Sequence, residues 1–118
     1  MPVSEAALGS ALADLRTAWP EGADAVTSCK MFGGAGFYAE GVFFAILDDD
    51  RLFFKVSPES AVAYDAEGME PWYIPGDPKP KAYREVPAAW RVDAARLRAA
   101  MDEAISVARA GSAGKKRR

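Results

Sequence analysis

The stretch from Lys30 to Lys55 constrains the fold of this chain more than any other. It is a dense run of aromatic and aliphatic residues, interrupted only by glycines and one acidic turn. Residues 42–47 are apolar on both faces and residues 52–56 alternate, which is typical of strands packed against a core. We predict three consecutive antiparallel strands here. Glycine at Gly33-Gly34-Ala35-Gly36 turns the chain, Glu40-Gly41 forms a tight turn or a bulge, and Asp48-Asp49-Asp50-Arg51 forms a hairpin turn.

Helical patterns flank the strands. Ser4 is a good N-cap, and the apolar stripe that runs from Leu8 to Trp19 predicts a helix over residues 5–19. Ser57-Pro58-Glu59 predicts the start of a short helix that ends at Gly68. The residues expected to face inward from this short helix are Val62 and Ala66.

The C-terminal third adds a hairpin and a last helix. Residues 71–74 and 82–86 read as a second hairpin whose proline-rich tip is exposed. Asp93 caps a helix that ends at Gly111. Its expected inward residues are Leu97, Met101, Ala104, Ile105 and Ala108. The order α-β-β-β-α-β-β-α predicts an α+β two-layer sandwich, with a five-stranded antiparallel sheet and flanking N- and C-terminal helices.

Length and composition set the broad class. The 118 residues are enough for one domain, which we place at residues 1–110, followed by a disordered basic tail over 111–118. No apolar run approaches the length of a membrane span, and the first residues lack the pattern of a secretory signal. The single cysteine, Cys29, excludes an intrachain disulfide. We therefore expect a cytoplasmic protein without membrane contact.

The chain contains no histidine. This excludes Ser-His-Asp and Cys-His nucleophile activation, histidine general-base chemistry and nearly all zinc sites. We expect no catalytic residue, no metal site and no cofactor, and hence a protein that is not an enzyme.

Charge is unevenly distributed along the chain. The formal net charge is −2, but residues 1–90 carry −7 and residues 91–118 carry +5. The basic excess lies in the last helix and the tail. Nucleic-acid contact through Lys115, Lys116, Arg117 and Arg118 is therefore an alternative to a role in protein binding.

Several motifs allow a sharper chemical interpretation. The glycines at 33–36 precede a strand rather than a helix, which favours a turn over a phosphate cradle. Asp48, Asp49 and Asp50 favour a solvated hairpin turn over a divalent-cation site. Cys29 beside Lys30 favours an ordinary strand residue over a low-pKa thiol.

Aromatic residues and lysines leave two further hypotheses open. Trp72, Tyr73 and Tyr83 would either pack on the sheet or present a base-stacking surface, and we favour packing. Lys30 and Lys55 would either extend along the sheet to solvent or bind a small anion or ligand beside the glycine turn.

The motif residues resemble the N-terminal domain of the TfoX/Sxy family. That family pattern is roughly Arg-x-Met-Phe-Gly-Gly-x-Gly-x-Tyr, then Gly-x-x-Phe-Ala, then Leu-Tyr-Leu-Lys. The matching positions, which we list as candidate site residues, are Lys30, Met31, Phe32, Gly33, Gly34, Gly36, Tyr38, Gly41 and Lys55. The motif arginine falls on Cys29, with Lys30 as a neighbouring cation. Later segments at Gly68-x-x-Pro71-Trp72 and Tyr83-x-x-Val86-Pro87 are also similar, so the resemblance covers about residues 5–109.

The resemblance implies a five-stranded antiparallel sheet with helices on one side, similar to the secretion-chaperone architecture. Named members of the family are regulators of natural competence that act with transcription factors, and no enzymatic activity is associated with the domain. Full-length regulators carry a second, helical C-terminal domain, for which this chain has no room. The resemblance thus predicts a regulatory interaction domain with a protein partner, and a homodimer through exposed sheet edges or helices is a further expectation.

Overall fold

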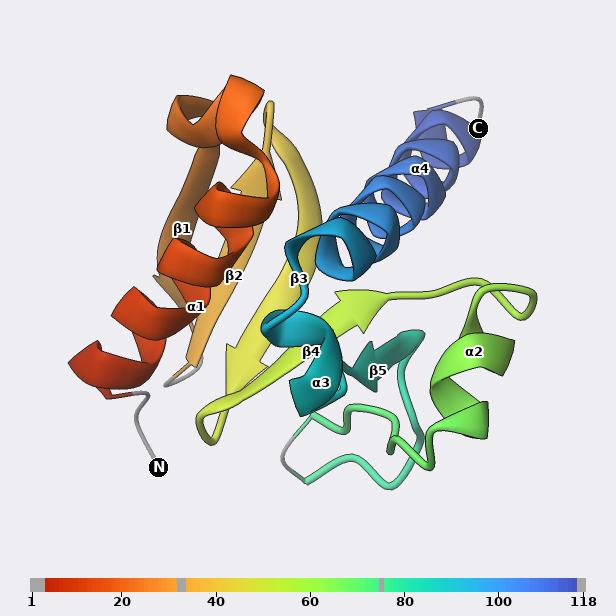
Figure 1. Ribbon diagram of the computed structural model, residues 1–118. Coiled ribbons are helices and arrows are strands. Elements are labelled where there is room, and N and C mark those ends of the chain that lie inside the picture. Colours follow the sequence, from red (N-terminus) through yellow and green to blue (C-terminus); the bar gives the residue numbers. More distant parts are fainter. Residues whose placement is uncertain (1–3, 32–33, 75, 117–118) are drawn as a thin grey trace.

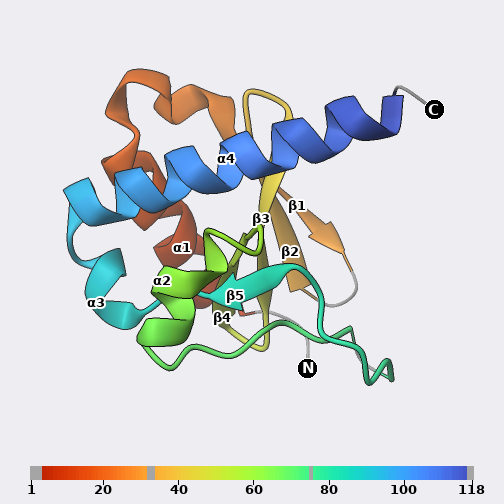
Figure 2. The same ribbon diagram turned by 90° about the vertical axis from the view of Figure 1, so that its right-hand side faces the viewer.

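The computed structural model describes residues 4–31, 34–74 and 76–116, which form an α+β fold of one sheet and one helical layer (Figure 1). In chain order the elements are α1 (Glu5–Ala18), η1 (Pro20–Ala25), β1 (Val26–Met31), β2 (Gly34–Ala39), β3 (Val42–Asp48), β4 (Arg51–Lys55), α2 (Ala61–Ala66), β5 (Tyr83–Glu85), α3 (Ala88–Arg91) and α4 (Ala94–Lys116). Helices α1 and α4 cover the same face of the sheet (Figures 1 and 2).

The sheet is an antiparallel meander in the order β1-β2-β3-β4-β5. This confirms the predicted five-stranded sheet between terminal helices. The predicted element order is wrong, because four strands precede α2 and one follows it. Residues 71–74 do not form a strand, and their link to β5 is an isolated bridge from Pro71 to Arg84.

The glycine run is strand rather than turn. Gly34 and Gly36 lie inside β2, opposite Met31 and Cys29, so the predicted turn over residues 33–36 is wrong. The link between β1 and β2 falls at residues 32–33, outside the described residues. A Cβ on Gly34 would collide with the backbone carbonyl oxygen of Leu47, so this glycine permits close approach of two strands.

The other two hairpin turns confirm the prediction. Glu40 and Gly41 have φ of 51° and 80°, and Asp49 and Asp50 have φ of 53° and 58°. Positive φ at both central residues is the two-residue hairpin turn whose twist matches the flanking strands, and aspartate tolerates this conformation.

The main core lies between the sheet and the helical layer. In β3 the register shifts, so that Phe37 pairs with Ala45 whereas Tyr38 pairs with Phe43. This bulge lets the consecutive residues Phe44 and Ala45 both join the core. The largest fully buried side chains are Tyr64, Phe37, Phe44, Phe54, Leu15, Leu47, Leu52, Leu97, Met101 and Val26.

Helix α1 matches its predicted range, and the Ser4 hydroxyl accepts a hydrogen bond from Ala7 N at 3.0 Å. Helix α4 is capped by Asp93, whose carboxylate accepts from Arg96 N at 3.1 Å, and its five predicted inward residues are all buried. The helix continues to Lys116, so the predicted stop at Gly111 is wrong. A helix ends at a glycine when the glycine takes positive φ, and Gly111 does not. The division into a domain over 1–110 and a disordered tail over 111–118 stays a prediction.

Helix α2 differs from the prediction in its start and in its buried face. Val62 is 65% exposed and Ala66 is exposed, whereas Ala61 and Tyr64 point inward. The regular helix begins at Ala61 rather than at Pro58, and Ala61 and Tyr64, three residues apart, share its buried face. Tyr64 packs on Trp90 of α3, a short helix that the sequence did not predict, with 4.8 Å between ring centroids.

None of the helices in the described part of the chain combines the length and apolarity needed to cross a membrane.

Candidate functional site

The face of the sheet opposite α1 and α4 carries a second apolar cluster. Strand alternation, together with the bulge at Phe44, directs Phe43 and Ile46 of β3 and Phe53 of β4 away from the helical layer. We call this surface the aromatic face and define it as Tyr38, Phe43, Ile46, Phe53, Trp72 and Tyr83. Ile46, Phe53 and Trp72 are buried in it, whereas Tyr38, Phe43 and Tyr83 are only half-buried.

The rings of the aromatic face form a continuous row across the sheet. Tyr38 stacks on Phe43 with 5.2 Å between ring centroids, and Phe43 lies 6.5 Å from Tyr83. Tyr83 in turn meets Trp72 edge-on at 5.7 Å. Offset and edge-to-face contacts at these separations are favourable, and the row is still partly open to solvent.

The segment before β5 is fixed over this face by Trp72. Its indole N–H donates to Asp48 Oδ2 at 2.8 Å, and its backbone N–H donates to the Tyr83 carbonyl at 3.2 Å. The Trp72 carbonyl accepts from Lys81 N at 2.8 Å. Backbone and side chain are thus both held, which closes the β5 end of the cluster.

Two cations border the aromatic face. Lys55 Nζ lies 5.0 Å from the centroid of Tyr83. Arg51 pairs with Glu85 at 2.8 Å and Glu70 at 3.0 Å while its guanidinium lies 5.3 Å from the Phe53 ring. The hydrogen bond to Glu85 raises the pKa of Arg51 above its ordinary value. Both positive groups therefore lie over or beside ring faces, where their attraction to the π electrons is favourable.

The two motif lysines lie on opposite faces of the sheet. Lys30 pairs with Ala35 on the helical side, and its Nζ lies 3.4 Å from Glu5 of α1. Lys55 pairs with Tyr83 on the other side. Strands β2 and β3 also separate them, so the two lysines do not form a shared anion site. A binding role for each lysine alone stays a prediction.

The other motif positions are mostly structural in this fold. Gly34 and Gly36 belong to β2, Gly41 belongs to a turn, and Tyr38 belongs to the aromatic face. The backbone of Met31 ends β1, and Phe32 and Gly33 lie outside the described residues.

The acidic turn has internal partners. Asp48 accepts from Trp72, and Asp50 accepts from the backbone N–H of Ser4 at 3.1 Å. Within the described residues no group of three or more aspartate, glutamate or cysteine side chains is arranged to hold a metal ion. Asp48 and Asp50 connect the turn to Trp72 and to the start of α1.

The aromatic residues of the second predicted hairpin do not form a shared stacking surface. Trp72 is 8% exposed and packs edge-on against Tyr83, while Tyr73 is 46% exposed. Burial raises the pKa of the Tyr83 hydroxyl, as expected for a ring held in an apolar cluster. This confirms the prediction of sheet packing for Trp72 and Tyr83.

The basic residues of α4 are engaged with neighbouring elements. Arg96 lies 3.6 Å from the centroid of Trp90, and Arg98 lies 4.0 Å from that of Trp19 while it pairs with Glu21. Arg109 pairs with Glu40 at 3.2 Å. Lys115 and Lys116 have only their backbone described, and Arg117 and Arg118 lie outside the described residues.

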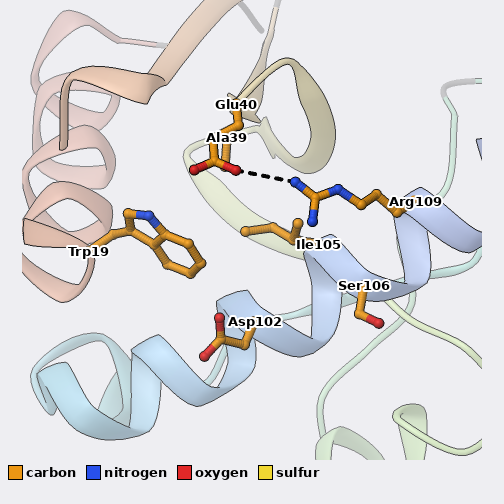
Figure 3. A pocket seen from close by; sticks show the side chains of 7 residues that line it. All are labelled: Trp19, Ala39, Glu40, Asp102, Ile105, Ser106 and Arg109. Atoms are coloured by element: carbon orange, nitrogen blue, oxygen red, sulfur yellow. Dashed lines mark hydrogen bonds and ion pairs between the residues drawn. The ribbon is translucent and has the colours of Figure 1, made fainter. Parts of the chain in front are cut away.

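A pocket of about 170 Å³ opens where α4 passes the β2–β3 turn (Figure 3). Its lining residues are Trp19, Ala39, Glu40, Asp102, Ile105, Ser106 and Arg109. The Arg109–Glu40 pair spans one side, and Asp102 pairs with Arg98 at 3.4 Å. Sequence reasoning missed this pocket because its residues come from distant segments without a shared motif. Its three charged side chains, Glu40, Asp102 and Arg109, each pair with a group of opposite charge.

The chain is similar to one family model, described as the TfoX N-terminal domain, over residues 21–108. No curated protein matches the chain. The family match begins after α1 and covers the whole sheet together with α4 up to Ala108. On this match the chain belongs to the TfoX N-terminal domain family.

Proposed function

We propose that this chain is a non-enzymatic regulatory domain that binds a protein partner through its aromatic face. The observation that carries the proposal is the row of half-buried rings, Tyr38, Phe43 and Tyr83, bordered by Lys55. Aromatic residues are enriched at the centre of protein interfaces because they bury much area with little loss of conformational entropy.

Charge supports a protein partner over nucleic acid at this face. Residues 1–90, which supply every member of the aromatic face, carry a net charge of −7. Nucleic-acid surfaces are normally basic, since they must neutralise phosphates. The arginines of α4 that are described contact acidic or aromatic neighbours instead.

The absence of histidine from the sequence supports a role without catalysis. Family membership supports a regulatory role, and we extend the proposal to regulation of competence or transcription in the cytoplasm. Full-length regulators of this family are the basis for that extension.

Partner capture with matched surface variants tests the proposal. The domain, immobilised by its N-terminus, is incubated with lysate of its native host, and captured proteins are quantified by mass spectrometry. Tyr38→Ala and Lys55→Ala are expected to lower capture of a specific partner at least about tenfold, as truncation of interface anchors does. Val92→Ala changes an apolar residue that is 88% exposed between α3 and α4 and is the matched control.

Equal loss with Val92→Ala, or full capture by both face variants, would contradict the proposal. Folding of every variant is checked by thermal unfolding, so that a loss of capture reports on the surface. The captured partner is then purified, and its affinity is measured directly by calorimetry.

Nucleic-acid binding through the C-terminus is the second candidate, favoured by the net charge of +5 on residues 91–118. A gel shift with the full chain and with residues 111–118 deleted decides it. A shift that disappears on deletion supports this role, and no shift with either protein removes it.

A further inference from the structure

The two edges of the sheet differ in how their backbone groups are satisfied. On the outer side of β5, Glu85 N donates to the Glu70 carbonyl at 3.0 Å and Trp72 N donates to the Tyr83 carbonyl at 3.2 Å. That edge is therefore closed by residues 70–72. Strand β1 is the outermost strand at the opposite edge (Figure 1). Exposed strand edges offer N–H and C=O groups that can pair with another strand.

The phase of the β1–β2 ladder identifies which groups of β1 are directed outward. Glu40 N donates to the Ala25 carbonyl at 3.1 Å, which makes residues 25 and 40 a hydrogen-bonded pair. In an antiparallel ladder every second pair is of this kind, so Thr27 and Cys29 bond to β2. The N–H and C=O groups of Ser28 and Lys30 are then directed away from the sheet.

Arg16 of α1 gives independent evidence for this phase. Its Nε and Nη2 both donate to the carbonyl oxygen of Val26, at 3.1 and 2.8 Å, and Val26 has the same phase as Ser28. The same contact blocks that carbonyl. In the part of the chain that the structure describes, Ser28 and Lys30 thus provide the outward backbone groups for an added strand. The Lys30 carbonyl accepts a hydrogen bond from Cys29 Sγ at 3.7 Å, and because a thiol is a weak donor, a backbone N–H of the added strand would replace it.

We propose that β1 pairs antiparallel with β1 of a second copy of this chain, with the two-fold axis at Cys29. In this register Ser28 of each copy exchanges two backbone hydrogen bonds with Lys30 of the other, which uses the open groups of both strands. The sheet of one copy continues into that of the other. Isologous pairing of this kind is the usual basis of two-fold dimers.

Two neighbouring registers of the β1–β1 pairing are less favourable than the one centred on Cys29. Centring the axis on Ser28 would pair Lys30 with Val26 of the other copy and require the carbonyl that Arg16 holds. Centring it on Lys30 would place two lysines directly opposite each other, and like charges in that position repel. The Cys29-centred register places each Lys30 opposite a serine, and Glu5 neutralises each lysine from its own copy at 3.4 Å. This self-complementarity favours a second copy over an unrelated strand.

The proposal has a direct chemical test, because Cys29 is exposed and is the single cysteine of the sequence. Opposed residues in a non-hydrogen-bonded pair have Cα atoms about 4.5 Å apart, within the range that a disulfide bridges. An added mild oxidant removes two electrons and two protons from the paired thiols. The wild type is expected to form a covalent dimer rapidly under native conditions.

A register-matched control separates this pairing from random collision. Thr27→Cys in a Cys29→Ser background places an exposed thiol on the same face of the same strand. In the proposed register the two copies of residue 27 lie about 13 Å apart along the strands, too far for a disulfide. Cross-linking is expected to be at least about tenfold slower than in the wild type. Equal rates would overturn the register.

Sedimentation equilibrium under reducing conditions tests the non-covalent dimer. The apparent molecular mass of the wild type and of Ser28→Ala is expected to rise from that of one chain toward that of two chains as the protein concentration increases. Ser28→Pro, which removes one outward N–H and no ladder donor, is expected to remain a monomer. A wild type with the mass of one chain at every concentration, or a folded Ser28→Pro that still dimerises, would overturn the proposal. If Ser28→Pro does not fold, the comparison of cross-linking rates between the wild type and Thr27→Cys in the Cys29→Ser background tests the proposal.

Discussion

Gly34 shows how a single missing side chain sets the spacing of the central strands. The residue lies in β2, and the carbonyl of Leu47 in β3 occupies the space that a Cβ would need. Gly9, in the middle of α1, has nothing within 4 Å of the same position. The two glycines therefore offer opposite expectations for the same substitution.

Gly34→Ala is expected to lower the free energy of unfolding by about 2 kcal/mol or more, because backbone atoms must move to relieve the overlap. Gly9→Ala is expected to raise it by about 0.5–1 kcal/mol, since alanine favours the helix. Urea unfolding followed by circular dichroism measures both. Similar stability of the two variants would show that the strands can separate without cost.

The buried hydroxyl of Tyr64 is expected to make the stability of the fold depend on pH above pH 10. Burial first, and then the charge of Glu103, raise the pKa of its hydroxyl above the ordinary value of 10.0. The unfolded chain then loses this proton at lower pH than the folded chain does. Stability is full below pH 10 and falls as pH rises through the folded pKa, by up to about 1.4 kcal/mol per pH unit.

Tyr64→Phe removes the ionising group, so its unfolding free energy is expected to decline less between pH 10 and pH 11.5 than that of the wild type, by up to about 1–2 kcal/mol. Urea titrations at several pH values give the two curves. Parallel curves would mean that Tyr64 ionises equally readily in both states.

At the scale of elements, the acidic β3–β4 turn and the start of α1 support each other. Asp50 accepts from the backbone N–H of Ser4, and the Ser4 hydroxyl in turn accepts from Ala7 N. The hydroxyl also lies 3.3 Å from Asp50 Oδ2. The turn thus orients the cap, which fixes where the helix begins.

Ser4→Ala is expected to destabilise the domain by about 1 kcal/mol through loss of this cap. Ser106→Ala, the same change at an exposed position inside α4, is expected to be neutral or slightly stabilising because alanine has the higher helix propensity. Thermal unfolding by calorimetry compares them. Equal effects would indicate that capping by Ser4 does not contribute.

Elements governed by local signals were predictable from the sequence. The caps at Ser4 and Asp93 and the inward stripe of α4 depend on neighbouring residues, as do the two-residue turns. The start of β2 at Gly34 depends instead on Leu47 of another strand, and the Lys30–Glu5 pair depends on how α1 packs. To predict that the two motif lysines lie on opposite faces of the sheet, the correct strand register is needed. The misplaced glycine turn gave a different register.

The aromatic face and the pocket also differ in how far the sequence predicts their residues. Tyr38 and Lys55 belong to the family motif and were among the predicted site residues. Trp72 joins the face because its indole reaches Asp48, a contact across 24 positions that no local pattern encodes. The residues around the Trp19–Arg109 pocket come together only when α1, α4 and the β2–β3 turn are assembled.

At the scale of the whole molecule, α4 combines a buried part with an exposed end. Among the residues of α4 whose burial the structure describes, Ala108 is the last buried one, and Arg109, Ala110 and Gly111 are exposed. Of the side chains of α4 that the structure describes, those that belong to the core therefore end at residue 108. Figure 2 shows the end of α4 extending past the sheet.

Deletion of residues 111–118 is expected to change the free energy of unfolding by less than about 0.5 kcal/mol, as for exposed surface changes. Deletion from Ala104 onward removes Ile105 and other buried side chains and is expected to abolish cooperative unfolding. Urea denaturation measures both. A large loss from the shorter deletion would place residues 111–118 within the folded domain.

Closure of the β5 edge by Glu70 and Trp72 also limits the stoichiometry of any assembly built by strand addition. A sheet with two receptive ends can recruit chains without limit, as fibrils do. In the described sheet one end is capped by the molecule's own backbone, so the proposed pairing at β1 would use the other edge of each participant. Growth would stop after a single encounter, which lets the chain keep an exposed strand without risking polymerisation.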